Sequence, residues 1–235
     1  MQHLTRRAFV TGAAALGMAA GGAGAAEGQL VWKKTDWQAG PFETLLKHPA
    51  RAKQVYDIVK INNGLFLNNV KNSLNGLEFG FGLARSEVKI AVAMHGPANM
   101  LNYDDAMWSK YQIGEWLKVD DPQTGKPAVR NIFRGKGKAA DAGATAENPD
   151  SEDSVYQARD MATLRGRGVQ FLSCHTATEE QARALVRLRK LTQSPEEIVK
   201  DMLAHMVEGT IMVPSMVAAI ALLQAEGRFT YITVA

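Results

Sequence analysis

Short apolar runs that alternate with helical patterns constrain the fold of this chain more than any other feature. Residues 88–96 (VKIAVAMHG) are almost continuously apolar, which is typical of a strand covered on both faces in a parallel sheet. An alternating apolar stretch predicts a strand at 53–61, and short apolar runs predict further strands at 168–174, 210–215 and 229–235. Strands that alternate with helices indicate an α/β fold with a mainly parallel sheet.

The segments between these strands carry helix signals. Residues 63–77 have an apolar stripe and Gly76 as a helix end, as expected for an amphipathic helix. A helix is also expected within 151–166. Further helices are predicted to start at Thr178, with Gln181 completing a capping box, to run from the Ser194 cap through Pro195 and Glu197 to Gly209, and to span 215–227.

The N-terminus has the pattern of an export signal. Arg6 and Arg7 precede a short run of Ala, Gly, Leu and Met, and Ala23-Gly24-Ala25 forms a small-x-small cleavage site. This pattern predicts a twin-arginine signal peptide at 1–25 and periplasmic localisation. The remaining residues, 26–235, are expected to form a single domain.

Composition excludes several classes of protein. The formal charge of +3 falls to about +1 when Arg6 and Arg7 leave with the signal, so the sequence predicts no nucleic-acid partner. No later segment is long and apolar enough to predict a membrane span. The chain has one cysteine, so it can form no intrachain disulfide and depends on packing for stability.

Residues 103–150 differ in character and are interpreted as an insertion, a loop lying over one end of the sheet. They begin with Tyr103, Asp104, Asp105 and Trp108, which either shape a pocket or an oligomer contact or simply anchor the loop. The glycines of GKGKAADAG follow no strand and open no helix. A nucleotide-binding loop is therefore not predicted.

The order of these motifs resembles the DsrE/DsrF-like (YchN-like) superfamily. The segments that carry the resemblance are VYDI, LNNVKNSLNGL, VKIAVAMHGPA, GVQFLSC and VPSMVAAIALLQAEGRFTYI, which together cover most of 54–101 and 151–235. The resemblance implies a three-layer fold with a five-stranded, mostly parallel sheet flanked by helices. It also implies a homo-oligomer, either trimer or hexamer. Some members carry sulfur as a cysteine persulfide, whereas many have no assigned activity. Export, the insertion and extra helical sequence between Cys174 and Val213 depart from that pattern.

Cys174 stands where the resemblance places the cysteine of the family. It ends a predicted strand and precedes a helix, and sites in open α/β sheets gather beyond the carboxyl ends of strands. Free N–H groups at a helix start stabilise a thiolate there, and His175 would supply a charge or take the proton. The alternative is that Cys174 is a small buried apolar residue.

His95 ends the neighbouring apolar run and is expected at the same sheet edge as Cys174 and His175. Two histidines and one cysteine suit a soft metal such as copper or zinc. Their spacing fits no established ligand motif, so no metal is predicted, and the simpler interpretation is that His95 closes the strand-to-helix turn with a hydrogen bond.

Two functions therefore follow from the sequence. In the first, the protein is an exported sulfur carrier in which Cys174 exchanges sulfur with a donor or acceptor protein, helped by His175 and His95. In the second, it is a non-catalytic binding or assembly module in which the insertion contacts a partner or small ligand and Cys174 is packed. A thiol pKa near or above its ordinary value of about 8.5 would favour the second. The sequence identifies no cofactor.

Overall fold

The computed structural model describes residues 31–137 and 148–234. The predicted signal peptide, its cleavage site and the centre of the insertion lie outside these residues. Within them, one five-stranded sheet has the order β6-β5-β2-β1-β7, and every neighbouring pair is parallel. Its strands are β1 (Ala52–Ile58), β2 (Val88–Met94), β5 (Gln170–Cys174), β6 (Ile211–Val213) and β7 (Thr230–Thr233).

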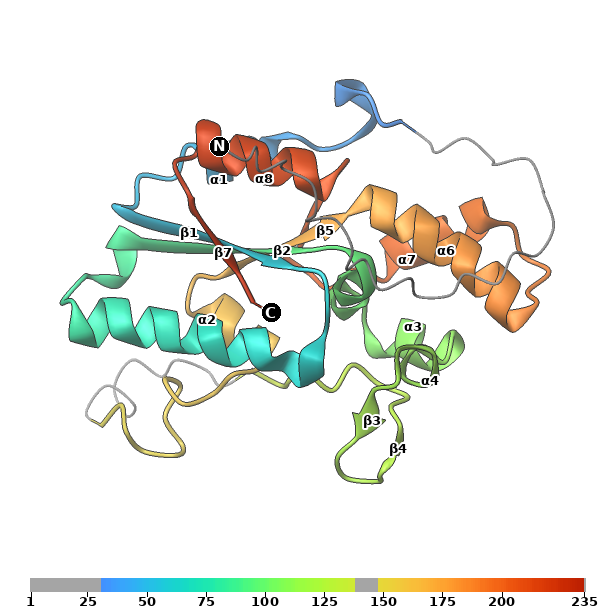
Figure 1. Cartoon of the computed structure of the whole chain (residues 1–235), viewed down its shortest axis with the longest axis horizontal. Coiled ribbons are helices and arrows are strands. Elements are labelled where there is room, and N and C mark those ends of the chain that lie inside the picture. The colour runs from blue at the N-terminus through green and yellow to red at the C-terminus, as the bar shows by residue number, and fades with distance from the viewer. Residues whose placement is uncertain (1–30, 138–147, 235) are drawn as a thin grey trace, which may run out of the picture.

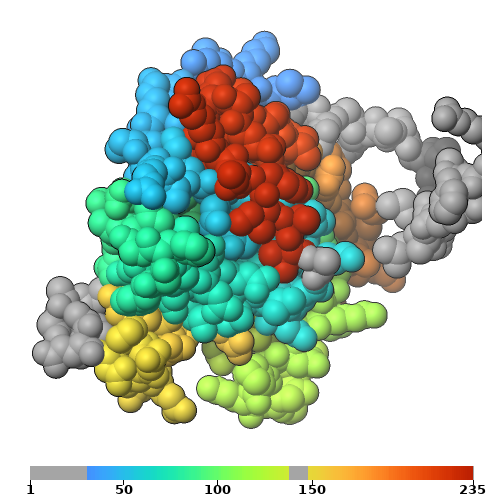
Figure 2. Space-filling view, turned by 60° about the vertical axis from the view of Figure 1, so that its left-hand side comes forward, coloured from blue at the N-terminus to red at the C-terminus, as the bar shows by residue number. Residues whose placement is uncertain are grey.

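Helices cover both faces of this sheet (Figure 1). On one face lie α1 (Gly40–Leu46) and α8 (Met216–Ala225). The other face carries α2 (Leu65–Asn75) and α5 (Met161–Gly166). The predicted three-layer α/β fold with a parallel five-stranded sheet is therefore confirmed. Figure 2 shows α8 and the C-terminal strand on the molecular surface above α2.

Strand alternation divides the apolar side chains into two cores. Along β2, Ile90, Val92 and Met94 face the α2 side, whereas Ala91 and Ala93 face α1 and α8. Successive residues of a strand point to opposite faces, and all five of these side chains are fully buried. This explains why the 88–96 run is continuously apolar rather than alternating.

Two more helices extend beyond the carboxyl ends of the strands. They are α6 (His175–Arg189) and α7 (Pro195–Ala204), which pack against one another (Figure 1). The Ser194 capping box with Glu197 forms as predicted, with Pro195 at the first helical position. The helix ends at Ala204, however, rather than continuing to Gly209.

The predicted start of α6 at Thr178 is wrong. The helix begins at His175 with Cys174 as its N-cap. Thr178 lies inside the helix, where its hydroxyl donates to the Cys174 carbonyl oxygen at 2.9 Å. The predicted helix within 151–166 is also shorter than expected, because the described part before Asp160 forms turns and Asp160 is the N-cap.

The insertion contains regular structure. It forms α3 (Asp105–Lys110), α4 (Ile113–Leu117) and a short hairpin of β3 (Asp120–Asp121) and β4 (Lys126–Pro127). Tyr103 and Trp108 are fully buried, and Asp104 caps α3 and pairs with His205 Nδ1 at 3.0 Å. These residues therefore anchor the insertion beside the end of α7.

Asn99 joins the sheet edge to α6. It lies in the 3₁₀ helix η5 (Gly96–Asn102) and is fully buried. Its Oδ1 accepts hydrogen bonds from Ser173 Oγ and from the Cys174 N–H, both at 2.9 Å. Its Nδ2 donates to Gln181 Oε1 at 3.0 Å and Thr178 Oγ1 at 3.1 Å. One amide thus satisfies polar groups from the strand and from the helix.

We predict that Asn99→Ala lowers the free energy of unfolding by about 3 kcal/mol, because several buried polar groups lose their partner. Asn72→Ala on the exposed side of α2 is the matched control, and it should change stability by less than about 0.5 kcal/mol. Urea unfolding of the two variants measures the difference. Equal stability of the variants would contradict a central role for Asn99.

Candidate functional site

The predicted residues lie at the carboxyl edge of the sheet. β2 and β5 are neighbours, and their last paired residues are Met94 and Ser173. His95 directly follows β2, Cys174 is the last residue of β5, and His175 begins α6. The expectation that all three residues share one edge is therefore confirmed.

Cys174 is enclosed in the core beneath α1 and α8 and is only 4% exposed. Its Sγ accepts hydrogen bonds from the backbone N–H groups of Ala177 at 3.4 Å and Met216 at 3.3 Å. Burial raises the pKa of the thiol, while these N–H groups act in the opposite direction without cancelling the rise. Because this pKa lies above its ordinary value, the thiol is protonated at neutral pH.

His175 points to a different environment. Its side chain is 2% exposed and stacks on Trp32, with ring centroids 3.6 Å apart and planes inclined by 28°. Its Nδ1 lies 3.6 Å from Glu179 Oε1. Burial lowers the pKa of His175 to about 4, so the imidazole is neutral at pH 7 and cannot supply a positive charge to Cys174.

His95 joins a polar cluster across three strands. Its Nε2 lies 2.8 Å from Asp57 Oδ1 at the end of β1, and Tyr231 of β7 donates its hydroxyl to Asp57 Oδ2 at 2.6 Å. That hydrogen bond to the carboxylate raises the pKa of Tyr231. The imidazole thus reaches across the sheet, whereas the sequence suggested a local bond in the turn. Asp57 was not identified from the sequence, although an acidic residue within an apolar strand is a signal.

The three predicted residues consequently do not form one site. They share an edge, but His95, Cys174 and His175 have separate partners. Within the described residues, no group of three His, Cys, Asp or Glu side chains is placed to hold a metal ion. The arrangement offers a sulfur atom beneath two helix N-termini, a stacked neutral imidazole and a separate His–Asp–Tyr cluster.

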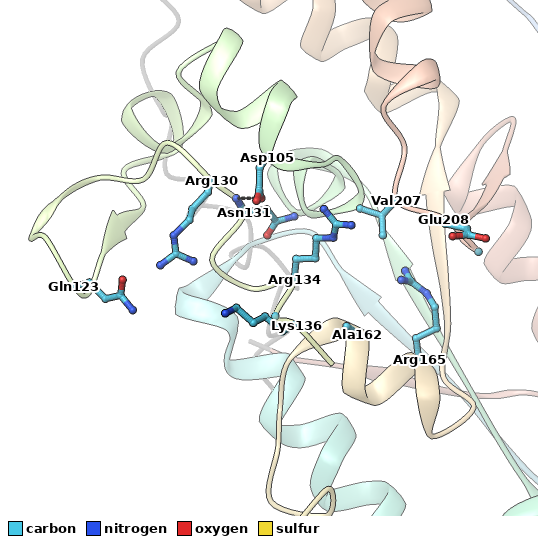
Figure 3. Close-up of a pocket in the computed structure, with 12 residues that line it drawn as sticks. Asp105, Gln123, Arg130, Asn131, Arg134, Lys136, Ala162, Arg165, Val207 and Glu208 are labelled. Atoms are coloured by element: carbon cyan, nitrogen blue, oxygen red, sulfur yellow. Dashed lines mark hydrogen bonds between the residues drawn. The ribbon is translucent and has the colours of Figure 1, made fainter. Parts of the chain in front are cut away.

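A second candidate lies at the insertion and α5, whereas Cys174 faces α1 and α8 on the other face of the sheet. It is a cavity of about 970 Å³. Its walls come from the insertion, from α5 and from the segment before β6. Figure 3 shows Arg130, Arg134 and Lys136 extending from one loop, with Arg165 from α5 beside them. The lining residues are Asp105, Gln123, Arg130, Asn131, Arg134, Gly135, Lys136, Ala162, Arg165, Val207, Glu208 and Gly209.

Positive charge predominates in this basic cavity, which has four Arg or Lys residues against Asp105 and Glu208. Asp105 already accepts a hydrogen bond from the Asn131 N–H at 2.9 Å, drawn in Figure 3. Arg130 pairs with Asp121 outside the lining at 3.0 Å. Arg134 and Lys136 are exposed, which leaves their charges directed at the cavity and the solvent.

Arg165 is the most constrained of these cations. Its guanidinium lies 5.3 Å from the ring centroid of Phe171, and one terminal nitrogen donates to Thr210 Oγ1 at 3.4 Å. Its Nε is buried without a hydrogen-bond partner within the described part of the chain. Burial and the charge of Arg134 lower the pKa of Arg165. An anion between the two guanidiniums would offset this repulsion.

From the sequence, a pocket at the insertion was one of three alternatives, and of the residues that line the cavity only Asp105 was named. Arg130, Arg134 and Lys136 lie within seven residues of one another, but Arg165 is 29 residues further along the chain. The formal net charge of only +3 also hides a local excess of positive charge. Only the packing of α5 against the insertion brings them together, through the Met161 N–H to Phe133 carbonyl bond at 3.0 Å.

Comparisons with known proteins add little. No protein-family model matches the chain, and no curated protein matches it. Among solved structures, a protein of unknown function from Methanobacterium thermoautotrophicum is 17% identical, with a TM-score of 0.38, over 78% of this chain and 99% of that chain. A likeness of this degree supports no statement about function. Within residues 31–137 and 148–234, no helix combines the length and apolar character that crossing a membrane requires.

The depressed pKa of His175 predicts a specific acid sensitivity. The unfolded chain binds a proton near pH 6.5 and the folded chain only near pH 4, so the stabilising contribution is complete above the higher value and is lost as pH falls through this window. The loss approaches about 3 kcal/mol. His175→Phe keeps an aromatic ring but has no group that titrates in this range. Urea unfolding between pH 6.5 and pH 4 should therefore show a smaller loss of stability in this variant than in the wild type. Parallel pH profiles would contradict the assignment.

Proposed function

We propose that the protein is a binding module that takes a small anionic molecule in the basic cavity of its insertion. The observation that carries this proposal is the gathering of Arg130, Arg134, Lys136 and Arg165 around one cavity of about 970 Å³. This volume suits a small-molecule ligand. The proposal corresponds to the second of the two functions considered from the sequence.

The chemistry of the cations indicates the class of ligand. A guanidinium offers a planar fork of N–H donors that matches carboxylate, phosphate and sulfonate groups, and such charge-assisted bonds are stronger than neutral ones. Arg134 and Arg165 lie close enough for the charge of one to lower the pKa of the other. A shared anionic group would therefore gain from both residues.

The environment of Cys174 supports this proposal over sulfur transfer. A reactive thiol needs exposure and a lowered pKa, whereas this thiol is 4% exposed and burial raises its pKa. In a binding module, Cys174 packs in the core like other small apolar residues. The homo-oligomer, trimer or hexamer, that the sequence resemblance implies stays a prediction.

Calorimetric titration with inorganic phosphate and with citrate tests the anion site. We expect binding that weakens as salt is added. The double substitution Arg134→Gln and Arg165→Gln should weaken it about ten-fold or more, through loss of two charge-assisted contacts. The double substitution Arg187→Gln and Lys190→Gln removes the same number of charges from the exposed side of α6 and its C-cap, and is the matched control. Undiminished binding in the Arg134 and Arg165 variant, or no binding by the wild type, would refute the proposal.

Sulfur carriage by Cys174 is the second candidate, and one observation favours it. The Sγ lies at the N-termini of both α6 and α8 and accepts one N–H from each, which is an arrangement that stabilises an anionic sulfur. In the transfer, the Cys174 thiolate would attack the terminal sulfur of a polysulfide, and the shortened polysulfide would leave with the electron pair. The resemblance to DsrE/DsrF-like proteins and the predicted export are consistent with a periplasmic carrier.

Intact mass measured without reductant tests the second candidate. After incubation with polysulfide, a carrier would gain the mass of one or more sulfur atoms on Cys174, and a reductant would remove it. Cys174→Ser is the control and should gain nothing. Because the thiol is buried and protonated, we expect the folded protein to stay unmodified and to react only after unfolding.

A further inference from the structure

A cavity of about 580 Å³ lies between α6, α7 and the first described residues of the chain. Its apolar wall includes Pro195, Val199 and Leu203 of α7, and its aromatic wall is formed by Trp32 and His175. It has no lining residue in common with the basic cavity. A predominantly apolar cavity of this size with a few polar groups is typical of a small-molecule site.

The stacked pair shows which chemistry the cavity accepts. The Trp32 indole lies 3.6 Å from the His175 ring, centroid to centroid. His175 is 2% exposed and lies at the carboxyl edge of the sheet, where ligands of open α/β sheets commonly bind. Its ring is held as a flat, uncharged platform, because burial lowers the pKa of His175 to about 4. Such a platform takes another flat ring.

Among the residues that the structure describes, few polar contacts hold the segment around Trp32. The segment that carries it has one 3₁₀ turn, η1 (Lys34–Asp36), closed by the Lys33 N–H on Asp36 Oδ2 at 2.7 Å. The ion pair of Lys34 with Glu43 spans 3.1 Å and is exposed, so it adds little. Trp32 precedes α1 and belongs to no described strand or α-helix. Trp32 is partly buried, so its place on His175 rests on burial of the indole and on ring stacking, which adds about 1 kcal/mol to the area burial.

The charged residues that line this cavity indicate a ligand without net charge. Glu179 and Glu196 are matched by Arg183 and Lys200, and Glu179 pairs internally with Arg183 at 3.7 Å. This balance contrasts with the excess of cations in the basic cavity. An anion or a cation would meet charges of both signs here and gain little.

We propose that this cavity binds a ligand with a flat aromatic ring and no net charge, and that the ring takes the place of the Trp32 indole on His175. The Trp32 indole then competes with the ligand for the same face of the His175 ring. The site is separate from the basic cavity and goes beyond the proposed anion binding. A ligand ring and a tethered indole cannot occupy the same face of His175, so removal of Trp32 raises the affinity of the ligand.

Calorimetry with indole tests this proposal. Trp32→Ala should bind indole about ten-fold or more tightly than the wild type, because a tethered competitor present at millimolar effective concentration is removed. Trp37→Ala, in the same segment but packed on Phe42, is the matched control and should bind like the wild type. Adding His175→Leu to Trp32→Ala should abolish the gain. Equal affinity of Trp32→Ala and wild type, or tighter binding by the wild type, overturns the proposal.

A measurement on the wild-type sequence tests the proposal even if the variants do not fold. In fluorine NMR spectra of protein labelled with 5-fluorotryptophan, the resonance of the Trp32 side chain should move to its solvent-exposed position as free indole saturates the site. The resonance that is missing from Trp32→Phe identifies it. Cyclohexanol, which is apolar but not aromatic, should leave it in place. A Trp32 resonance that does not move with indole, or moves equally with cyclohexanol, overturns the proposal. Phosphate and citrate binding at the basic cavity is measured separately, so the two proposals fail independently.

Discussion

The buried amide of Asn99 is the interaction on which the carboxyl edge of the sheet depends. Its oxygen accepts hydrogen bonds from Ser173 Oγ and the Cys174 N–H at the end of β5. Its nitrogen donates hydrogen bonds to Thr178 and Gln181 in α6. An amide that uses both its donor and its acceptor groups in a fully buried place leaves little freedom to the elements it joins. The positions of Cys174 and His175 follow from this network.

The two faces of the sheet keep the candidate sites apart. Strand alternation turns Cys174 toward α1 and α8, together with Leu172 and Val213. Phe171, one residue from Leu172, faces the opposite core and supports the Arg165 guanidinium. A single strand, β5, therefore carries an enclosed thiol on one face and supports one lining residue of the basic cavity on the other. A substitution in either place need not affect the other, which separates anion binding from sulfur carriage experimentally.

Much of the fold could be predicted from the sequence, because the periodicity of apolar residues and the capping residues are local signals of helices and strands. The continuous apolar run 88–96 predicts a central strand of a parallel sheet, and Ser194 with Glu197 predicts the start of α7. Thr178 and Gln181 have the spacing of a capping box, which predicts that α6 starts at Thr178. In the structure, both side chains instead accept hydrogen bonds from Asn99, and the helix starts earlier. A capping pattern does not reveal whether its side chains bind their own backbone or a distant amide.

What the sequence by itself determined is the layout of the chain: the α/β alternation, the parallel strands, the Ser194 cap of α7 and the edge where His95, Cys174 and His175 lie. Only the tertiary structure decided the environments of those residues. The burial of Cys174, the stacking of Trp32 on His175 and the approach of Arg134 to Arg165 join segments distant along the chain. Burial and charge proximity set pKa values and binding chemistry, and both arise from packing between elements rather than from the pattern within any one of them.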